Sequence, residues 1–381
     1  MTPRRLSAVA ASTAAVSLTL AAGSAAARTP FHAHDQRARD RAVFVQTDAT
    51  AGNSIAVYDR GHHGSLSPAR TYSTGGNGGV LGGSQVDHLA SQDSLVYDAR
   101  ANELLAVNAG SNTVTVFGVH GDRLHRRRIT SSGGDFPVSI AVHGGLVYVL
   151  NALNGGTIQG YRLIDGSLSP IPGSSRPLGL DPTATPQFTT TPGDIAFTPN
   201  GGDLLVTTKG NTNAIDVFAI DDRGLPAAAP VVNSEPGTVP FSLAFEGAHQ
   251  VDVGEAGPNA VGSFSLQDDG TLQPLASLGT GGSATCWLVA DGSVLFAGNA
   301  GSATESSVLD SPSGALTLAA TTSTDPGTVD AAPTPGGHYL YVQTGRNGIV
   351  DEFQVGSAGA LTELGSVTVP NAVGGEGIAT S

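Results

Sequence analysis

Residues 104–117, LLAVNAGSNTVTVF, carry the pattern that decides the fold. Leu104 to Val107 is a continuous apolar run of the kind found in a strand that is buried on both faces. Asn108 to Asn112 supplies the glycine and asparagine that a tight hairpin turn needs. Val114 to Phe117 is a β-branched and aromatic return strand. The stretch therefore predicts a β-hairpin.

The same hairpin recurs along the chain, each time as an apolar strand, a short turn and a return strand. The further copies are 43–46 with 55–58, 147–151 with 157–161, 204–208 with 215–218, 251–255 with 261–264, 294–299 with 307–309, and 339–343 with 349–353. A Gly/Asp-rich turn that ends in leucine follows each return strand. These leucines are Leu66, Leu124, Leu168, Leu225, Leu272, Leu316 and Leu361. They recur roughly every 44 residues, the period of a four-stranded propeller blade, with two intervals about 13 residues longer.

A third strand precedes every hairpin except the first, as in Ser139 to Val142. The chain ends in Gly377 to Thr380, which matches this missing strand. The sequence therefore predicts an all-β, seven-bladed β-propeller over residues 42–381, with its C-terminal strand joining the N-terminal blade to close the ring. The two longer intervals place insertions at Gly75 to Ser91 and Arg176 to Thr191, and such loops are usually functional or disordered.

The two ends and the composition limit the classes of function. Residues 1–27 have a charged start, an apolar stretch and an A-x-A site, which predicts a signal peptide and a secreted protein; residues 28–41 are expected to be a flexible linker. A net charge of −14 argues against nucleic acid or anionic membranes as partners. No later stretch is long and apolar enough for a membrane span, and a monomer is expected. Cys286 is the only cysteine, so we expect an inert core thiol rather than a disulfide.

Several segments together resemble the lactonase-family seven-bladed β-propellers. These segments are LASQDSL at 89–95, VNAGSNTVTVF at 107–117, FPVS at 136–139, PGSSRPL at 172–178 and the repeated blade signature x-P-N/D-G-x-x-L-x-V. That family includes a bacterial 6-phosphogluconolactonase and the fungal carboxymuconate-lactonizing enzyme. The resemblance covers residues 42–381 and implies a lactonase-type hydrolase. No segment carries over the catalytic histidine and arginine residues of those enzymes.

The starts of the inner strands are expected at one mouth of the central channel. Most are small, as packing near the axis requires, but Asp194, Trp287 and Asp330 are not. Two carboxylates and an aromatic plate at a channel mouth could bind a sugar-like ring. Alternatively, the aspartates bond to neighbouring backbone amides and Trp287 plugs the channel.

The ends of the second strands fall at the same mouth. They include Asn108, Asn151, Glu255 and Asn299, whose oxygens could bind substrate or hold calcium, although the sequence requires no cofactor and no metal ligand is identified. The alternative is that the asparagines are there because they favour entry to a hairpin turn. Glu255 does not share that explanation.

Lactone hydrolysis needs an activated water and a group that stabilises the oxyanion. In the inserted segments, His88 could act as the base, Gln92 could bind substrate, and Arg176 could hold a carboxylate or phosphate. Alternatively, His88 is an idle surface residue and Arg176 forms a structural salt bridge.

Two hypotheses follow from the sequence. The first is a secreted lactonase-like hydrolase, which cleaves a sugar-lactone or similar cyclic ester with His88, Arg176, Asp194, Glu255 and Asp330 at the channel mouth. The second is a propeller without catalysis that binds a small carbohydrate, a surface ligand or a protein partner.

Overall fold

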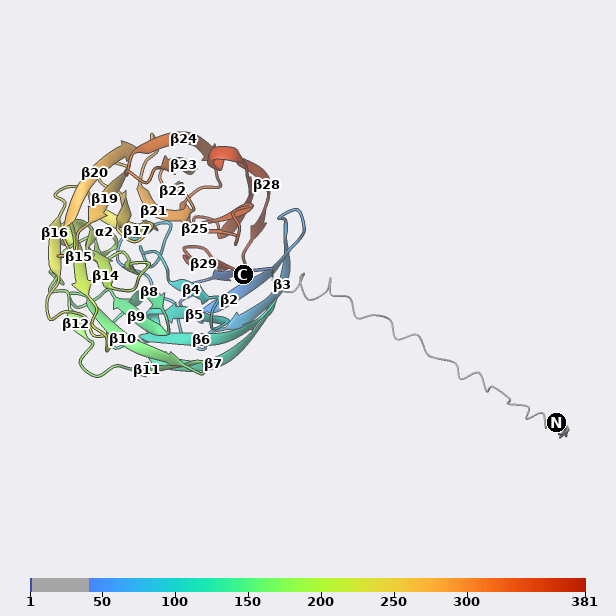
Figure 1. Cartoon of the computed structure of the whole chain (residues 1–381), viewed down its shortest axis with the longest axis horizontal. Coiled ribbons are helices and arrows are strands. Elements are labelled where there is room, and N and C mark those ends of the chain that lie inside the picture. The colour runs from blue at the N-terminus through green and yellow to red at the C-terminus, as the bar shows by residue number, and fades with distance from the viewer. Residues whose placement is uncertain (2–40) are drawn as a thin grey trace.

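Seven antiparallel sheets of four strands each, one of them with a short fifth strand, form a closed ring around a central channel in the computed structural model (Figure 1). The structure describes Met1 and residues 41–381. The predicted signal peptide and linker lie outside the described residues, apart from Met1 and Arg41. No helix in the described part of the chain is long and apolar enough to cross a membrane. The ring of seven sheets confirms the predicted seven-bladed propeller.

Each blade is numbered here by its order around the ring. Blade 1 contains β29 (Ile378–Thr380), β1 (Ala42–Gln46), β2 (Ser54–Arg60) and β3 (Leu66–Ser73). Blade 2 contains β4 (Leu95–Asp98), β5 (Glu103–Asn108), β6 (Thr113–His120) and β7 (Arg123–Ser131). Blade 3 contains β8 (Pro137–His143), β9 (Leu146–Asn151), β10 (Thr157–Ile164) and β11 (Ser167–Pro170), and the short β12 (Arg176–Pro177) also pairs with β10.

The remaining blades repeat the same order from the channel outward. Blade 4 contains β13 (Ile195–Phe197), β14 (Asp203–Thr207), β15 (Ala214–Ala219) and β16 (Val231–Ser234); blade 5 contains β17 (Pro240–Glu246), β18 (Gln250–Glu255), β19 (Ala260–Leu266) and β20 (Leu272–Gly279). Blade 6 contains β21 (Thr285–Asp291), β22 (Val294–Asn299), β23 (Thr304–Asp310) and β24 (Leu316–Ser323); blade 7 contains β25 (Thr328–Pro333), β26 (Tyr339–Thr344), β27 (Ile349–Val355) and β28 (Leu361–Thr368). Only short helices interrupt the strands, namely α2 (Gln187–Thr190), α3 (Lys209–Thr212), η1 (Ala109–Ser111) and η2 (Ser357–Gly359).

The hairpin predicted at residues 104–117 is the β5–β6 pair, in which Leu104 lies opposite Phe117. Its turn contains η1 and ends at Asn112, whose φ of 55° is in the left-handed region that asparagine tolerates. Every residue of β5 is buried. Middle strands such as this one pack blade against blade, and this packing explains their continuous apolar runs.

Hydrogen bonds from buried hydroxyl groups to turn residues join neighbouring blades. Tyr148 of blade 3 donates to the carbonyl of Gly224 in blade 4 (2.8 Å), and Tyr341 of blade 7 donates to that of Gly64 in blade 1 (2.6 Å). The Gly-rich turn that ends in leucine therefore docks on the preceding blade, which gives the repeated turn signature a packing role.

The C-terminal strand closes the ring as predicted, because β29 pairs with β1 and places Ile378 opposite Val45. The preceding Glu376 is fully buried, and its carboxylate accepts hydrogen bonds from the Ser94 amide and the Ser91 hydroxyl, both at 3.3 Å. Its own amide donates to Asp48 at 2.8 Å. The last residues therefore tie blade 1 to the start of blade 2.

A chain that ends at Asn371 should unfold at a markedly lower temperature than the intact chain, because β1 loses its inner partner and becomes an exposed edge. Circular dichroism melting measures this loss, and a synthetic peptide of residues 372–381 should restore part of it. An unchanged melting temperature after truncation would show that this pairing does not hold the ring shut.

Candidate functional site

The first inserted loop (residues 75–91) lies across one mouth of the channel and reaches the opposite side of the ring. The Trp287 indole in β21 donates to the carbonyl of Ser91 at 2.8 Å. The side chain of Gln92, directly after the loop, exchanges two hydrogen bonds of 2.9 Å with the backbone of Leu288. Gln92 therefore anchors the loop to blade 6, and its amide is occupied by backbone.

Lys209 joins the first inserted loop to the second (residues 176–191). Its side chain is fully buried, and Nζ donates to the carbonyls of Ala90 (2.6 Å) and Phe188 (2.9 Å) and to the Thr191 hydroxyl (3.2 Å). The ammonium group also lies 5.2 Å from the centre of the Phe241 ring, as a cation–π contact. Burial lowers the pKa of Lys209 to about 7, although the Asp87 carboxylate opposes this effect.

A cavity of about 540 Å³, called here the mouth pocket, lies between the two inserted loops and blades 4 to 7. Its lining is Gln85, Val86, Asp87, Ala90, Phe188, Thr189, Lys209, Val239, Phe241, Ala256, Ala284, Cys286, Trp287, Ala300, Gly301, Ala303, Pro326, Gly327 and Arg346. The volume is that of a pocket for a small organic ligand. The predicted insertions thus form one wall of this cavity.

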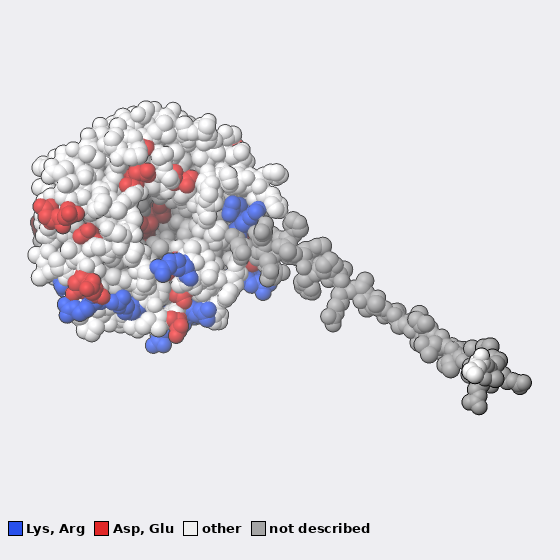
Figure 2. All heavy atoms as spheres, viewed as in Figure 1, with Lys and Arg blue, Asp and Glu red and all other residues white. Residues whose placement is uncertain are grey.

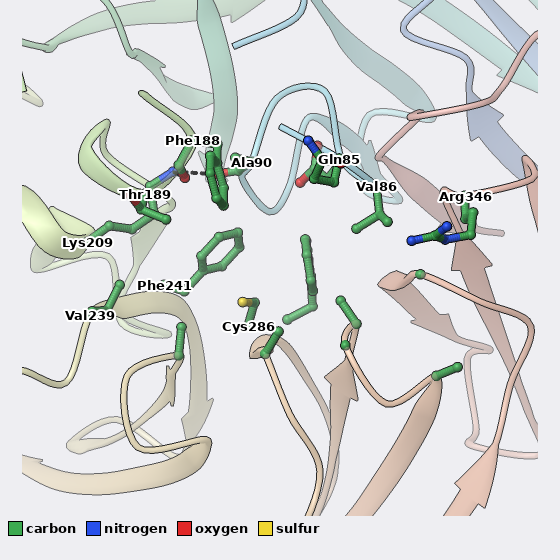
Figure 3. Close-up of a pocket in the computed structure, with 18 of the residues that line it drawn as sticks. Gln85, Val86, Ala90, Phe188, Thr189, Lys209, Val239, Phe241, Cys286 and Arg346 are labelled. Atoms are coloured by element: carbon green, nitrogen blue, oxygen red, sulfur yellow. Dashed lines mark hydrogen bonds between the residues drawn. The ribbon is translucent and has the colours of Figure 1, made fainter. Parts of the chain in front are cut away.

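Aromatic side chains form the centre of the mouth pocket. The rings of Phe241 and Trp287 are 4.9 Å apart between centroids and tilted by 60°, and Phe188 of the second inserted loop adds a third ring. Figure 3 shows Lys209 and Arg346 on opposite sides, with Phe241 and the sulfur of Cys286 between them. Burial raises the pKa of Cys286 to about 12, so the thiol is protonated and a poor nucleophile.

The charged side chains that line the mouth pocket differ in whether they already have hydrogen-bond partners in the protein. The Asp87 carboxylate is buried and accepts hydrogen bonds from the amides of Leu89 (2.7 Å) and Ser91 (2.9 Å), which shape the first inserted loop. Burial raises the pKa of Asp87 to about 6. Arg346 is exposed, and its guanidinium has no hydrogen bond or ion pair with any residue in 41–381.

Two predicted acids, Asp194 and Asp330, are buried in the channel wall and do not line the mouth pocket. The Asp194 carboxylate accepts from the Ser139 hydroxyl (3.0 Å) and the Leu243 amide (2.9 Å). Asp330 accepts from the amides of Ala331 (2.9 Å) and Ile378 (3.2 Å). Burial, and secondarily the charge of Asp93, raises the pKa of both carboxyls well above the usual range. These contacts match the alternative that the aspartates bond to local backbone.

The predicted second-strand residues point into the blades rather than into the mouth pocket. Asn108 donates to the Thr115 hydroxyl at 2.9 Å, Asn151 to the Ser132 carbonyl at 3.2 Å, and Asn299 to the Ser306 hydroxyl at 2.9 Å. The Glu255 carboxylate accepts from Ser277 at 3.2 Å, and burial raises its pKa. Asn108, Asn299 and Glu255 therefore bond within their own blades, whereas Asn151 bonds to the connection that leads from blade 2 to blade 3.

His88 and Arg176 also lie outside the mouth pocket. The ring of His88 packs against Gly374, burial lowers its pKa, and Nδ1 has no hydrogen-bond partner in the described part of the chain. The guanidinium of Arg176 donates to the carbonyls of Gly173, Ser175, Pro226 and Ala227 at the outer edge of blades 3 and 4. The structure thus does not bring these two side chains together, and Arg176 is held by carbonyls rather than by a salt bridge.

A group of buried carboxylates lies within the channel. Asp93 lines a second cavity of about 320 Å³ at the opposite channel end, and Figure 2 shows one face of the ring hollowed at its centre, with acidic side chains in the hollow. The Asp93 side chain has no hydrogen-bond partner among residues 41–381, and burial raises its pKa to about 7. Among the described residues, no three His, Cys, Asp or Glu side chains are arranged to hold a metal ion.

Trp287, which the sequence predicted as a binding residue, lines the mouth pocket, whereas Arg346, Phe241 and Phe188 also line it but were not predicted. Trp287 stood out because the other blades carry small or acidic residues at that register. Lys209 could also have been singled out from the sequence, because it is the only lysine. Arg346 follows an ordinary second strand, and nothing in its local pattern marks it as unpaired.

No protein-family model matches the sequence, and no curated protein sequence matches it significantly. Solved structures share its fold. A periplasmic gluconolactonase from Pseudomonas aeruginosa has a TM-score of 0.71 and 20% identity, with 89% of this chain and 98% of that chain covered. A candidate 6-phosphogluconolactonase from Bacteroides fragilis has a TM-score of 0.70 and 18% identity, with 90% and 98% covered. Virginiamycin B lyase from Staphylococcus aureus has a TM-score of 0.54 and 13% identity, with 77% and 89% covered.

These likenesses establish a propeller fold shared with lactonase-type proteins. At such low sequence identities the likeness shows the fold alone, and it does not assign the activities of those proteins to this chain.

Replacing Lys209 with methionine should loosen both inserted loops while leaving the blades folded. The substitution strands two buried carbonyls, at a cost of about 1–3 kcal/mol each, so loop amides should exchange about tenfold faster or more. Hydrogen-exchange mass spectrometry of residues 85–92 and 186–191 measures the effect. Arg346→Met is the matched control and should leave the exchange unchanged. Equal protection in both variants would contradict the bridging role of Lys209.

The intact protein should lose stability as the pH rises towards neutrality, because Asp93 then loses its proton. Replacing Asp93 with asparagine should reduce this loss. The folded-state pKa of about 7 lies above the unfolded value of 3.8, so the fold holds a proton that the unfolded chain releases between these values. This contribution to stability is complete below pH 3.8 and is lost as pH rises towards 7. The melting temperatures should agree near pH 4, and the variant should be several degrees higher at pH 8. Asp268→Asn on the surface is the control, and parallel pH profiles for all three proteins would rule the effect out.

Proposed function

We propose that this protein is an exported, lactonase-like propeller that binds a small ring-shaped molecule, such as a lactone or similar cyclic compound, in the mouth pocket. The observation that carries the proposal is a cavity of about 540 Å³ that combines three aromatic rings with an arginine, Arg346, that has no partner among residues 41–381. Aromatic faces bind planar or puckered rings, and a few polar groups fix their orientation. The fold likeness to a gluconolactonase and the apolar N-terminal segment support the lactone class and export.

Hydrolysis of the bound lactone is the second candidate. The observation that favours it is that a carboxyl group with a pKa of about 6, Asp87, lines the same pocket as the cationic Arg346. In such a reaction Asp87 accepts a proton from the attacking water, and Arg346 stabilises the oxyanion that forms on the carbonyl oxygen. The ring C–O bond then breaks as Asp87 returns the proton to the departing ring oxygen, and the product is a hydroxy acid. Against it, the Asp87 oxygens already accept two backbone amides, which favours binding without catalysis.

Trp287 gives a direct test, because it is the only tryptophan in the sequence and it lines the mouth pocket. Lactones that enter the pocket should change its emission in a saturable manner, and Trp287→Phe should abolish this signal. A parallel assay of acid release separates binding from hydrolysis. If hydrolysis occurs, Arg346→Gln should lower kcat by about tenfold or more, as expected for the loss of an oxyanion-stabilising group.

Arg100→Gln is the control for that substitution, because Arg100 lies in the β4–β5 turn at the opposite end of the inner strands. It should leave binding and turnover unchanged. A panel of aldonolactones and aromatic lactones that produces neither a fluorescence change nor acid release would reject the proposed function.

A further inference from the structure

We infer that the ligand of the mouth pocket is an apolar or aromatic ring that carries a carboxylate, rather than a polyhydroxylated sugar lactone. This inference rests on the proposed function, because it names the chemical class of the ligand for the same pocket. It is based on which polar groups of the pocket lining already have hydrogen-bond partners in the protein and which do not.

Apolar side chains make up most of the walls of the mouth pocket. Phe188, Phe241 and Trp287 supply ring faces, and Val86, Val239 and Pro326 supply aliphatic surface. The remaining small side chains leave space for a ring; these are Ala256, Ala284, Ala300 and Ala303. A ligand gains affinity in such a pocket in proportion to the apolar area it buries.

The other polar side chains that line the pocket already form hydrogen bonds within the protein; Lys209 and Asp87 are buried, whereas Gln85 is exposed. Lys209 donates to three oxygens, and Asp87 accepts two amides. Thr189 donates its hydroxyl to the carbonyl of Pro186 at 3.1 Å, and Gln85 donates to that of Gly83 at 3.2 Å. A sugar lactone carries a hydroxyl on almost every ring carbon, and each one buried without a partner weakens binding. The lining therefore disfavours a polyol.

Arg346 is the exception, because its guanidinium is exposed on the rim and has no partner among the described residues. Figure 3 shows it across the pocket from Lys209, beside Val86. A guanidinium binds a carboxylate through two parallel hydrogen bonds, and neighbouring apolar surface strengthens the pair by excluding water. The combination selects a ring that enters the aromatic centre and an anionic group that remains at the rim.

Isothermal titration calorimetry of the full chain with three probes tests this inference. The probes are coumarin-3-carboxylate, neutral coumarin and glucono-1,5-lactone, so that two share the aromatic lactone ring and only one carries a carboxylate. We expect coumarin-3-carboxylate to bind about tenfold or more tighter than either of the others. Arg346→Gln should remove the advantage of the carboxylate and leave the affinity for coumarin unchanged, whereas Arg100→Gln should change neither.

Two results separate the failure of this inference from the failure of the proposed function. If glucono-1,5-lactone binds as tightly as coumarin-3-carboxylate or tighter, or if Arg346→Gln weakens both coumarins equally, the ligand class is wrong while the mouth pocket still binds lactones. If none of the three probes binds, the proposed function fails as well.

Discussion

The ring has to close, and the whole structure depends on the pairing that closes it. Three residues of β29 pair with β1, and the buried Glu376 before them connects blade 1 to the start of blade 2. Packing of Val43 and Tyr58 against Tyr341, and the hydrogen bond from Tyr341 to Gly64, also join blade 7 to blade 1, but the single cysteine allows no intrachain disulfide to lock the closure. Closure also fixes the position of the inner strands, so the channel mouth is a rigid rim on which loops can be built.

The mouth pocket results from two insertions placed on that rim. One inserted loop crosses to blade 6 through Ser91 and Gln92, and Lys209 links it to the other. Since the blades leave the ring symmetric in outline, the insertions supply the asymmetry that turns a channel opening into a ligand-sized cavity. The carboxylates of Asp194 and Asp330 lie buried in the channel wall, and this burial accounts for their raised pKa values.

The fold followed from the sequence, whereas most of the site did not. The hairpin at 104–117, the leucine spacing and the pattern at Gly377 to Thr380 are local signals repeated along the chain, so each copy supported the others. The site depends on contacts between distant segments. Asp194, Asp330 and the asparagines were placed at the correct register, but register does not show whether a side chain faces the cavity or a backbone amide. Arg346 matters because it has no hydrogen-bond or ion-pair partner in the described part of the chain, and the absence of a contact leaves no pattern in the sequence.

The burial of Lys209 has a practical consequence for the chemistry of the folded protein. Because this is the only lysine in the sequence, the folded chain offers no exposed side-chain amine, and acylating reagents are left with the N-terminal amino group. Lysine-directed crosslinkers, dyes and lysyl endopeptidase should therefore react with the ε-amino group only when the inserted loops open. The rate at which this single amine is acylated is thus a built-in measure of how often the mouth pocket opens, without any introduced label.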